Sequence, residues 1–95
     1  MSKSCFVLRC IDAPEVGSKR AELREAHVAH VRGAGVTRLA GPLLDDSGAI
    51  VGSLLVIEVD DLAAAEGFSA ADPYRQAGVF RTVEIQPYRP TYVAF

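Results

Sequence analysis

Long apolar runs, basic charge and cysteine are all scarce in this sequence. A helix that crosses a membrane needs about 18–20 consecutive apolar residues, and no such run occurs, so we expect no membrane-spanning role. The 10 Lys and Arg residues are outnumbered by 12 Asp and Glu residues, which gives a net charge of −2. A nucleic-acid-binding domain needs a basic patch, so we expect no nucleic-acid partner.

The two cysteines, Cys5 and Cys10, lie in one apolar run near the N-terminus. If that run is a strand, side chains five positions apart point to opposite faces, which excludes a disulfide between them. A redox pair or a metal site is then less favoured than two small apolar core residues. We therefore expect no disulfide.

A metal site has weak support as well. His27 and His30 have a spacing that places both on one face of a helix. A zinc site needs three or four ligands, and outside the first apolar run the sequence offers no other Cys or His. An aspartate could complete such a site, but the spacing alone does not indicate one, so we expect no metal.

The length of 95 residues leaves room for a single domain, which we expect to span residues 1–95. A chain this short buries about 60–65% of its unfolded surface, so its thin core needs a metal, a disulfide or a partner. With the first two disfavoured, a partner chain is expected. Lys3 and Arg9 interrupt the N-terminal apolar run, unlike a signal peptide, so we expect a cytoplasmic protein.

Hydrophobic periodicity predicts four strands and two helices in the order β-α-β-β-α-β. The predicted strands are Lys3–Ile11, Val36–Leu44, Ile50–Val59 and Val79–Tyr88, and the predicted helices are Glu15–Ala34 and Leu62–Ala71. Gly41-Pro42 marks the second strand as an edge strand or one that ends in a bulge, because proline cannot donate to a ladder.

Side-chain alternation also predicts the faces of the strands. Ser53 should share a face with Leu55, and Val83 should lie on the face opposite Phe80. After the last strand, the tail 89–95 is too apolar for a free chain end.

This element order is that of the ferredoxin-like α+β fold, in which two helices cover one face of a four-stranded antiparallel sheet. The first and third strands are apolar on both faces, so the face without helices should be apolar too. Such a patch is seldom left in water, and a second copy of the same sheet would cover it. We therefore predict a dimeric α+β barrel, a homodimer joined through the open sheet face.

Three residues are candidates for chemistry. His27 follows Leu23 at helical spacing and turns toward the sheet, either as a core residue or as a general base. Asp72 precedes Pro73 at the end of the second helix, either as a turn residue or as a catalytic carboxylate. Ser53 either packs in the third strand or lines a site. Composition and spacing alone do not pair these residues.

Five segments resemble the YCII-related (YciI-like) family in their order and intervals, and together they span nearly the whole chain. They are Arg24-Glu25-Ala26-His27, Ala40-Gly41-Pro42, Gly52-Ser53, Ala71-Asp72-Pro73-Tyr74 and Ala77-Gly78-Val79. The helix histidine and the Asp-Pro-Tyr motif are the most specific of them, and many relatives have proline in place of Glu25. The resemblance implies a dimeric α+β barrel with a histidine–aspartate pair as its proposed active centre.

For this chain, the resemblance implies a catalytic pair and a set of pocket residues. The pair is His27 and Asp72, the residues lining the same pocket are Ser53, Gly41 and Pro42, and the residue beside it is Tyr74. Either Arg9 or Arg24 could hold a substrate carboxylate.

Such a pair is suited to proton transfer. An aspartate that accepts from one imidazole nitrogen presents the other nitrogen as a base and stabilises the imidazolium formed, and this kind of catalysis contributes about 10²–10⁴-fold. No serine or cysteine nucleophile at a strained turn accompanies it, which favours isomerisation, elimination or lactone chemistry over acyl transfer.

We therefore predict a cofactor-independent enzyme of the isomerase or lyase kind, acting on a small polar or acidic molecule. One alternative is a non-catalytic ligand-binding or accessory domain that retains the pocket. In another alternative, the protein has the fold of barrel-forming monooxygenases and muconolactone isomerases but not the histidine–aspartate site.

The pair also carries a prediction about the first helix. Because the two helices run antiparallel, Asp72 should lie level with the start of that helix. His27 should then come early in its main part, so Glu15–Glu22 should form a separate turn or loop, or the helix should bend near Glu25. One straight helix from Glu15, with His27 far from Asp72, would exclude the pair.

Overall fold

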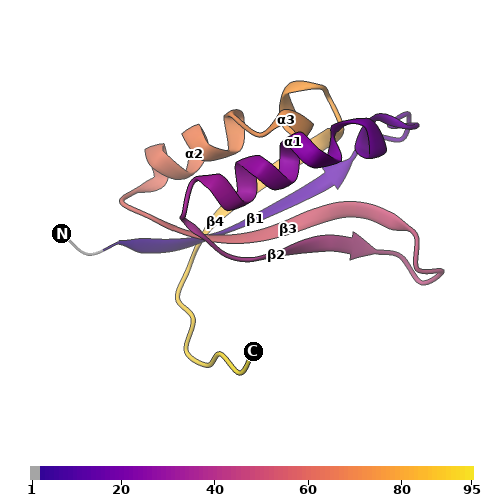
Figure 1. The fold of residues 1–95 in the computed structure, drawn as a ribbon. Coiled ribbons are helices and arrows are strands. Elements are labelled where there is room, and N and C mark those ends of the chain that lie inside the picture. The colour runs from indigo at the N-terminus through magenta and orange to yellow at the C-terminus, as the bar shows by residue number, and fades with distance from the viewer. Residues whose placement is uncertain (1–2) are drawn as a thin grey trace.

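The computed structural model describes residues 3–95 (Figure 1). The strands are β1 (Ser4–Asp12), β2 (Thr37–Leu44), β3 (Ile50–Val59) and β4 (Phe80–Tyr88), and the helices are α1 (Lys19–Gly33), α2 (Leu62–Ala70) and α3 (Pro73–Gln76). All six predicted elements are present, β3 with the predicted bounds and the others with at least one end shifted by one to four residues. The short α3 follows α2 after a break at Asp72.

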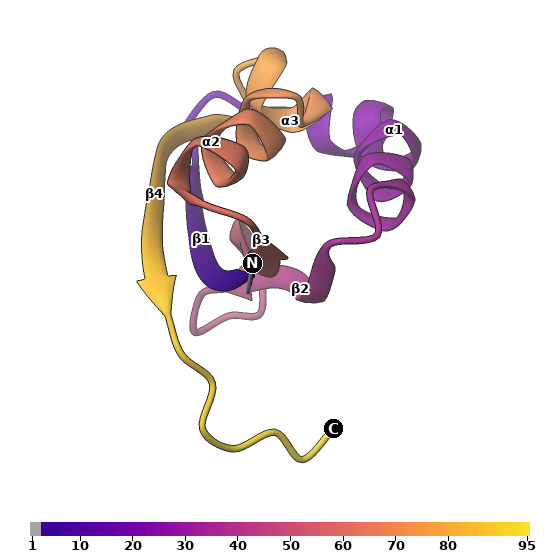
Figure 2. The same cartoon turned by 90° about the vertical axis from the view of Figure 1, so that its left-hand side faces the viewer.

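The four strands form one antiparallel sheet in the order β2-β3-β1-β4. The helices all lie on the same side of this sheet (Figure 2). This is the predicted ferredoxin-like α+β arrangement, and β2 lies at an edge, as Gly41-Pro42 indicates. None of the helices described within residues 3–95 has the length and hydropathy of a membrane span.

The core lies between the sheet and the helices. Alternate residues along part of each central strand point into it and are buried, together with Ala65 of α2. These strand residues are Phe6, Leu8, Cys10, Leu55, Ile57 and Val59. The central strands dominate the core because their alternate positions are almost all apolar and pair directly, as Leu8 does with Leu55.

Cys10 is buried in this core, whereas Cys5 is half-buried and lies on the opposite face of β1. Both thiols are free, as their spacing predicts. Burial, followed by the negative charge of Asp72, raises the pKa of the Cys10 thiol to about 12. The thiol stays protonated at neutral pH, so Cys10 serves as a small apolar core residue.

The start of β4 departs from simple alternation. The register against β1 shifts, so that Thr82 pairs with Ile11 while Phe80 pairs with Asp12. Phe80 and Val83 consequently pack against the same core. The prediction that they lie on opposite faces is wrong, because the bulge inserts one residue and reverses the alternation before it.

The helix α1 begins at Lys19, four residues later than predicted. Gly17, in the preceding turn, has a φ of +56°, a left-handed conformation through which a right-handed helix does not continue. From Lys19 the helix runs to Gly33 as one element, and His27 lies near its middle.

The predicted early position of His27 is therefore wrong, since residues 19–22 belong to the helix and the turn ends at Ser18. The prediction assumes that Asp72 lies level with the start of α1. In the structure Asp72 opens α3, which packs alongside α1. Asp72 thereby reaches the middle of the helix.

The face of the sheet without helices is apolar at its centre, as predicted, but it also carries polar residues, among them the Arg9–Glu84 ion pair. Val7 of β1, Val56 of β3 and Leu39 of β2 lie directly opposite one another and form a row across three strands. Val7 and Val56 are half-buried and Leu39 is exposed. We call these three residues the open-face row.

The tail 89–95 leaves the sheet on the side away from the helices (Figure 1). The side chains of Tyr92, Val93 and Phe95 are 83%, 71% and 105% exposed. Within one chain the tail is therefore free, contrary to the expectation from its composition. The exposed apolar tail and the open-face row lie on the same side of the sheet.

Candidate functional site

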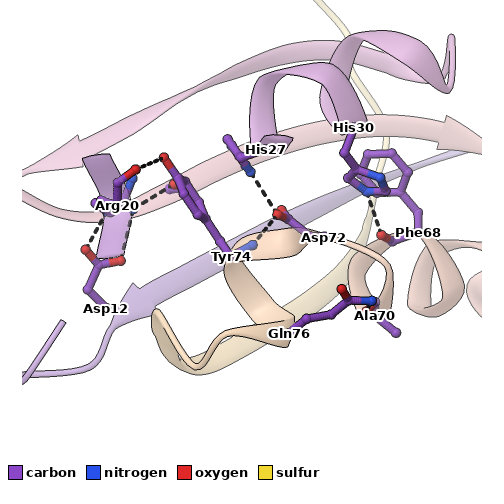
Figure 3. Close-up of polar contacts among 10 residues, drawn as sticks. Asp12, Arg20, His27, His30, Phe68, Ala70, Asp72, Tyr74 and Gln76 are labelled. Atoms are coloured by element: carbon purple, nitrogen blue, oxygen red, sulfur yellow. Dashed lines mark hydrogen bonds and ion pairs between the residues drawn. The ribbon is translucent and has the colours of Figure 1, made fainter. Parts of the chain in front are cut away.

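His27 of α1 and Asp72, the residue just before α3, are in direct contact (Figure 3). The His27 Nδ1 atom lies 2.9 Å from Asp72 Oδ1, and the two side chains are 13% and 5% exposed. An ionised carboxylate can accept a hydrogen bond but cannot donate one, so it keeps the imidazole proton on Nδ1. The Nε2 atom is left as the proton acceptor of the ring.

Asp72 is fixed by the backbone of α3. It is the N-cap of this helix, and its Oδ1 also accepts a hydrogen bond from the Tyr74 N–H at 2.9 Å. Pro73 occupies the first helical position and holds the preceding residue in an extended conformation. The Asp-Pro pair thus ends α2, starts α3 and directs the carboxylate at α1.

The Tyr74 ring supports the imidazole. The two rings stack with their centroids 4.0 Å apart and their planes 11° from parallel. The tyrosine is itself held, because its hydroxyl donates to the Arg20 carbonyl oxygen at 3.1 Å and its ring meets the edge of Phe80. This packing restricts rotation of the His27 side chain about its contact with Asp72.

Arg20, in the first turn of α1, links three elements. Its Nε and Nη2 atoms donate to the two carboxylate oxygens of Asp12 at 2.6 and 2.9 Å. Nη2 also donates to Ser53 Oγ at 2.9 Å. Burial opposes the charge, but the hydrogen bonds and charge of Asp12 outweigh it and raise the pKa of Arg20 above its usual value. The guanidinium is therefore charged, and its three hydrogen bonds hold it in place.

A cavity of about 720 Å³ lies between α1 and the strands β2 and β3. Its lining residues are Arg20, Ala21, Arg24, His27, Val28, Val31, Arg32, Ala40, Gly41, Pro42, Ile50, Ser53, Leu55 and Tyr74. His27 borders the cavity, while Asp72 lies behind it. The arrangement can therefore present a base to a small molecule and keep the supporting carboxylate buried.

The lining of this cavity is positively charged. It includes Arg20, Arg24 and Arg32, and no acidic residue of the described chain is part of it. Asp12 neutralises Arg20, whereas Arg24 and Arg32 are exposed. Their positions differ by multiples of four, so the three arginines follow one side of α1.

The structure brings most of the predicted site residues to this cavity. Gly41 and Pro42 of β2 lie beside Ser53 of β3 because Pro42 pairs with Ser53, and Arg24 faces them from α1. Tyr74 contributes the stacked ring.

Arg9 is the exception among the predicted substrate-binding residues. It is exposed on the face of β1 away from the helices, where its guanidinium lies 3.5 Å from the Glu84 carboxylate. Of the two alternatives, the structure therefore favours Arg24, because Leu8 and Cys10 face the core and alternation turns Arg9 outward.

Asp12 and Arg20 are site residues that sequence reasoning does not find. Helical periodicity places Arg20 away from the apolar stripe of α1, which indicates a solvated charge. The available signal is the pair of opposite charges at the end of the first strand and in the first turn of the next helix. A β-α unit brings these two positions to the same edge of the sheet.

His30, three residues beyond His27, has a separate environment. Its Nε2 atom lies 2.9 Å from the Phe68 carbonyl oxygen, and its ring stacks on Phe68 with centroids 4.4 Å apart. Across residues 3–95, no group of three or more His, Cys, Asp or Glu side chains is arranged to hold a metal ion. His30 thus connects α1 to α2.

The sheet topology and the cavity beside α1 define a protein with the fold of the dimeric α+β barrel class. One such structure is 5-chloro-2-hydroxyhydroquinone dehydrochlorinase from Burkholderia phenoliruptrix, in complex with 2,5-dihydroxybenzoquinone. It has a TM-score of 0.80 at 23% identity, over 90% of this chain and 93% of that one. Rv0793 from Mycobacterium tuberculosis has a TM-score of 0.54 at 16% identity, over 99% and 100% of the two chains.

The chain belongs to the YCII-related family, whose domain model matches residues 5–89. Protein YciI of Escherichia coli is 31% identical over 96 residues, which cover 92% of this chain and 98% of that protein. An uncharacterized protein of Haemophilus influenzae is 28% identical with the same coverage. The family indicated by the sequence motifs is thereby confirmed.

Proposed function

We propose that this protein is a small cofactor-independent enzyme in which His27 and Asp72 carry out proton transfer. The observation that carries the proposal is the 2.9 Å contact between His27 Nδ1 and Asp72 Oδ1, made beside the cavity that His27 lines. His27 Nε2 would take a proton from a substrate carbon, and the Asp72 carboxylate would stabilise the imidazolium that forms.

Two kinds of reaction can follow this proton abstraction. In an isomerisation, the imidazolium returns the proton to a different atom of the substrate. In an elimination, the electron pair of the broken C–H bond forms a double bond and expels a leaving group. Both need one mobile proton and no redox cofactor, which matches a site built from one base and one carboxylate.

The lining supports a small acidic or polar organic molecule as substrate. Arg24 and Arg32 supply positive charge without an acidic neighbour in the lining, and Val28, Val31 and Leu55 supply apolar surface. An anionic group would bind the arginines while an apolar ring or chain packs against these side chains. The structural relative that binds 2,5-dihydroxybenzoquinone makes hydroxylated quinones and aromatics a rational first set of test compounds.

The test is proton exchange in deuterated buffer, followed by NMR on hydroxyquinones, small carboxylic acids, lactones and halogenated phenols. We expect one class to exchange a C–H proton or to turn over, and His27→Ala to lower that rate by about 10²–10⁴-fold. His30→Ala is the matched control, because His30 is on the same helix but contacts Phe68. Equal rates in wild type and His27→Ala would contradict the proposal.

The second candidate function is a non-catalytic ligand-binding or accessory domain. The same charged and apolar cavity supports it, since binding does not require a proton acceptor. Ligand binding that persists in His27→Ala and in Asp72→Asn, without turnover in the wild type, would favour this candidate.

We also propose that residues 1–95 act as a single domain within a cytoplasmic homodimer, joined through the open sheet face. The open-face row and the exposed tail on the same side of the sheet support the dimer. A second copy would remove both apolar surfaces from water, where burial contributes about 25 cal/mol per Å².

Val56→Glu should therefore break the dimer. Val56 is at the centre of the open-face row, and a glutamate there would lose its hydration on burial in the interface without gaining an ionic partner in this apolar row. Light scattering should give twice the 10.1 kDa chain mass for the wild type and the single-chain mass for the variant. Leu62→Glu, which adds the same charge on exposed α2, should remain dimeric. A monomeric wild type would overturn this assignment.

A further inference from the structure

We propose that Arg20 is a positioning residue that makes the Ser53 hydroxyl a hydrogen-bond donor to an oxygen atom of the bound ligand. The inference deepens the proposed function and rests on it for the identity of the ligand site. It concerns the side of the cavity formed by β3, where Ser53 lies opposite Pro42.

The direction of one hydrogen bond carries the argument. Arg20 Nη2 lies 2.9 Å from Ser53 Oγ, and a guanidinium donates but cannot accept, so Ser53 Oγ must be the acceptor. The one hydroxyl hydrogen of Ser53 then points to another partner. Among the hydrogen bonds of residues 3–95, none uses this hydrogen, although Ser53 is only 4% exposed and lines the cavity.

Arg20 is held too firmly to release Ser53. Two hydrogen bonds join its guanidinium to Asp12, whose side chain is 8% exposed. Its backbone carbonyl accepts from the Tyr74 hydroxyl, and its guanidinium carbon lies 4.9 Å from the Tyr74 ring centroid. Because Asp12 neutralises the guanidinium, the main effect of Arg20 on a ligand passes through Ser53 rather than through its own charge.

The consequence is a preference for one kind of ligand atom. A buried donor without a partner is costly, so the ligand atom next to Ser53 should be a carbonyl, enolate or phenolate oxygen. When His27 takes a proton from the adjacent carbon, negative charge develops on such an oxygen. A hydroxyl already oriented toward it would stabilise this charge without reorganisation.

The first test needs no variant and no ligand. Neutron crystallography of the deuterated protein should show the Ser53 deuterium pointing into the cavity, with Arg20 Nη2 donating to Ser53 Oγ. A deuterium directed at Asp12 or at a main-chain carbonyl would overturn the proposal. This result is independent of turnover, so a protein without catalytic activity could still satisfy it.

The second test is a double-mutant cycle with 2,5-dihydroxybenzoquinone, whose ring carries carbonyl and oxyanion oxygens, measured by calorimetry. Arg20→Met and Ser53→Ala should each weaken binding about tenfold, and the double variant should lose no more than about tenfold. Arg81→Met, which removes the same charge at an exposed position on β4, is the control. Additive losses of about 100-fold would overturn the proposal, because they would mean that Arg20 does not act through Ser53.

The two tests distinguish a failure of the Arg20–Ser53 inference from a failure to identify the ligand. A wild type that binds none of this quinone, with the deuterium pointing into the cavity, would count against hydroxyquinones as the ligand class while supporting the role of Arg20. If Arg20→Met does not fold, Arg20→Lys replaces it in the cycle. Lysine keeps the charge beside Asp12 but lacks the planar fork that reaches both partners, so it should also weaken binding.

Discussion

Asp72→Asn should leave the fold intact and lower the rate of proton transfer by about 10²–10⁴-fold. Asparagine is as good an N-cap as aspartate, so the bond to the Tyr74 N–H and the start of α3 should survive. What is lost is the negative charge beside His27. The oxygen that accepts from Tyr74 is the same Oδ1 that contacts His27, so an asparagine that keeps the cap also keeps an oxygen at Nδ1. That amide oxygen is uncharged, so it stabilises the imidazolium less.

Two measurements check this prediction. Turnover of the substrate found for the wild type should fall in Asp72→Asn, while circular dichroism should show that the fold is retained. Asp61→Asn is a matched control, since Asp61 caps α2 through the Ala64 N–H at 2.9 Å and lies outside the cavity lining. Unchanged turnover in a folded Asp72→Asn variant would mean that the carboxylate charge plays no part.

Gly52→Ala should destabilise the protein by about 3–5 kcal/mol, which is a large part of the stability of a typical small domain. A Cβ atom at this position would lie 2.2 Å from the Cys10 carbonyl oxygen. That oxygen belongs to the backbone of β1, the neighbouring strand, so it cannot move without disturbing the pairing of Ile11 with Gly52. The position needs glycine because two backbones approach closely there, and its φ is not in the left-handed region.

Urea denaturation followed by circular dichroism would measure the loss. Gly67→Ala provides a control of opposite sign, because Gly67 lies within α2 and an added Cβ meets nothing within 4 Å. Alanine there should stabilise the helix by about 0.5–1 kcal/mol. A Gly52→Ala variant as stable as the wild type would show that β1 can move away from β3.

Local patterns in the sequence account for most of the secondary structure. The strand at Ile50–Val59 has the same bounds in the prediction and in the structure, because an apolar run with turn residues before it has few alternatives. The start of β4 is different. The face of Phe80 depends on a bulge in the pairing with β1, which involves residues about 70 positions away and leaves no mark on the alternation within β4 itself.

The candidate site shows the same division between local and distant information. Residue spacing marks His27 and Asp72 singly, but they are 45 positions apart, and the family resemblance rather than any periodicity pairs them. Arg20 and Ser53 are 33 positions apart, and neither the periodicity nor the family motifs quoted for this chain connect them. For a charged residue away from the apolar stripe of a helix, periodicity predicts exposure to solvent. Its actual partners become known only from the tertiary structure.

By itself the sequence determined the β-α-β-β-α-β order, an edge strand or bulge at Gly41-Pro42, the apolar centre of the open face and the separation of the two cysteines. These features follow from periodicity, from the missing N–H of proline and from side-chain alternation, all of which act between near neighbours in the chain. The tertiary structure alone decided where α1 begins relative to Asp72, that Arg20 pairs with Asp12, and that Arg20 donates to the Ser53 hydroxyl oxygen. The physical reason is that each of these depends on the packing of α1 and α3 against the sheet, where groups distant in the chain meet and satisfy one another's charges and hydrogen bonds.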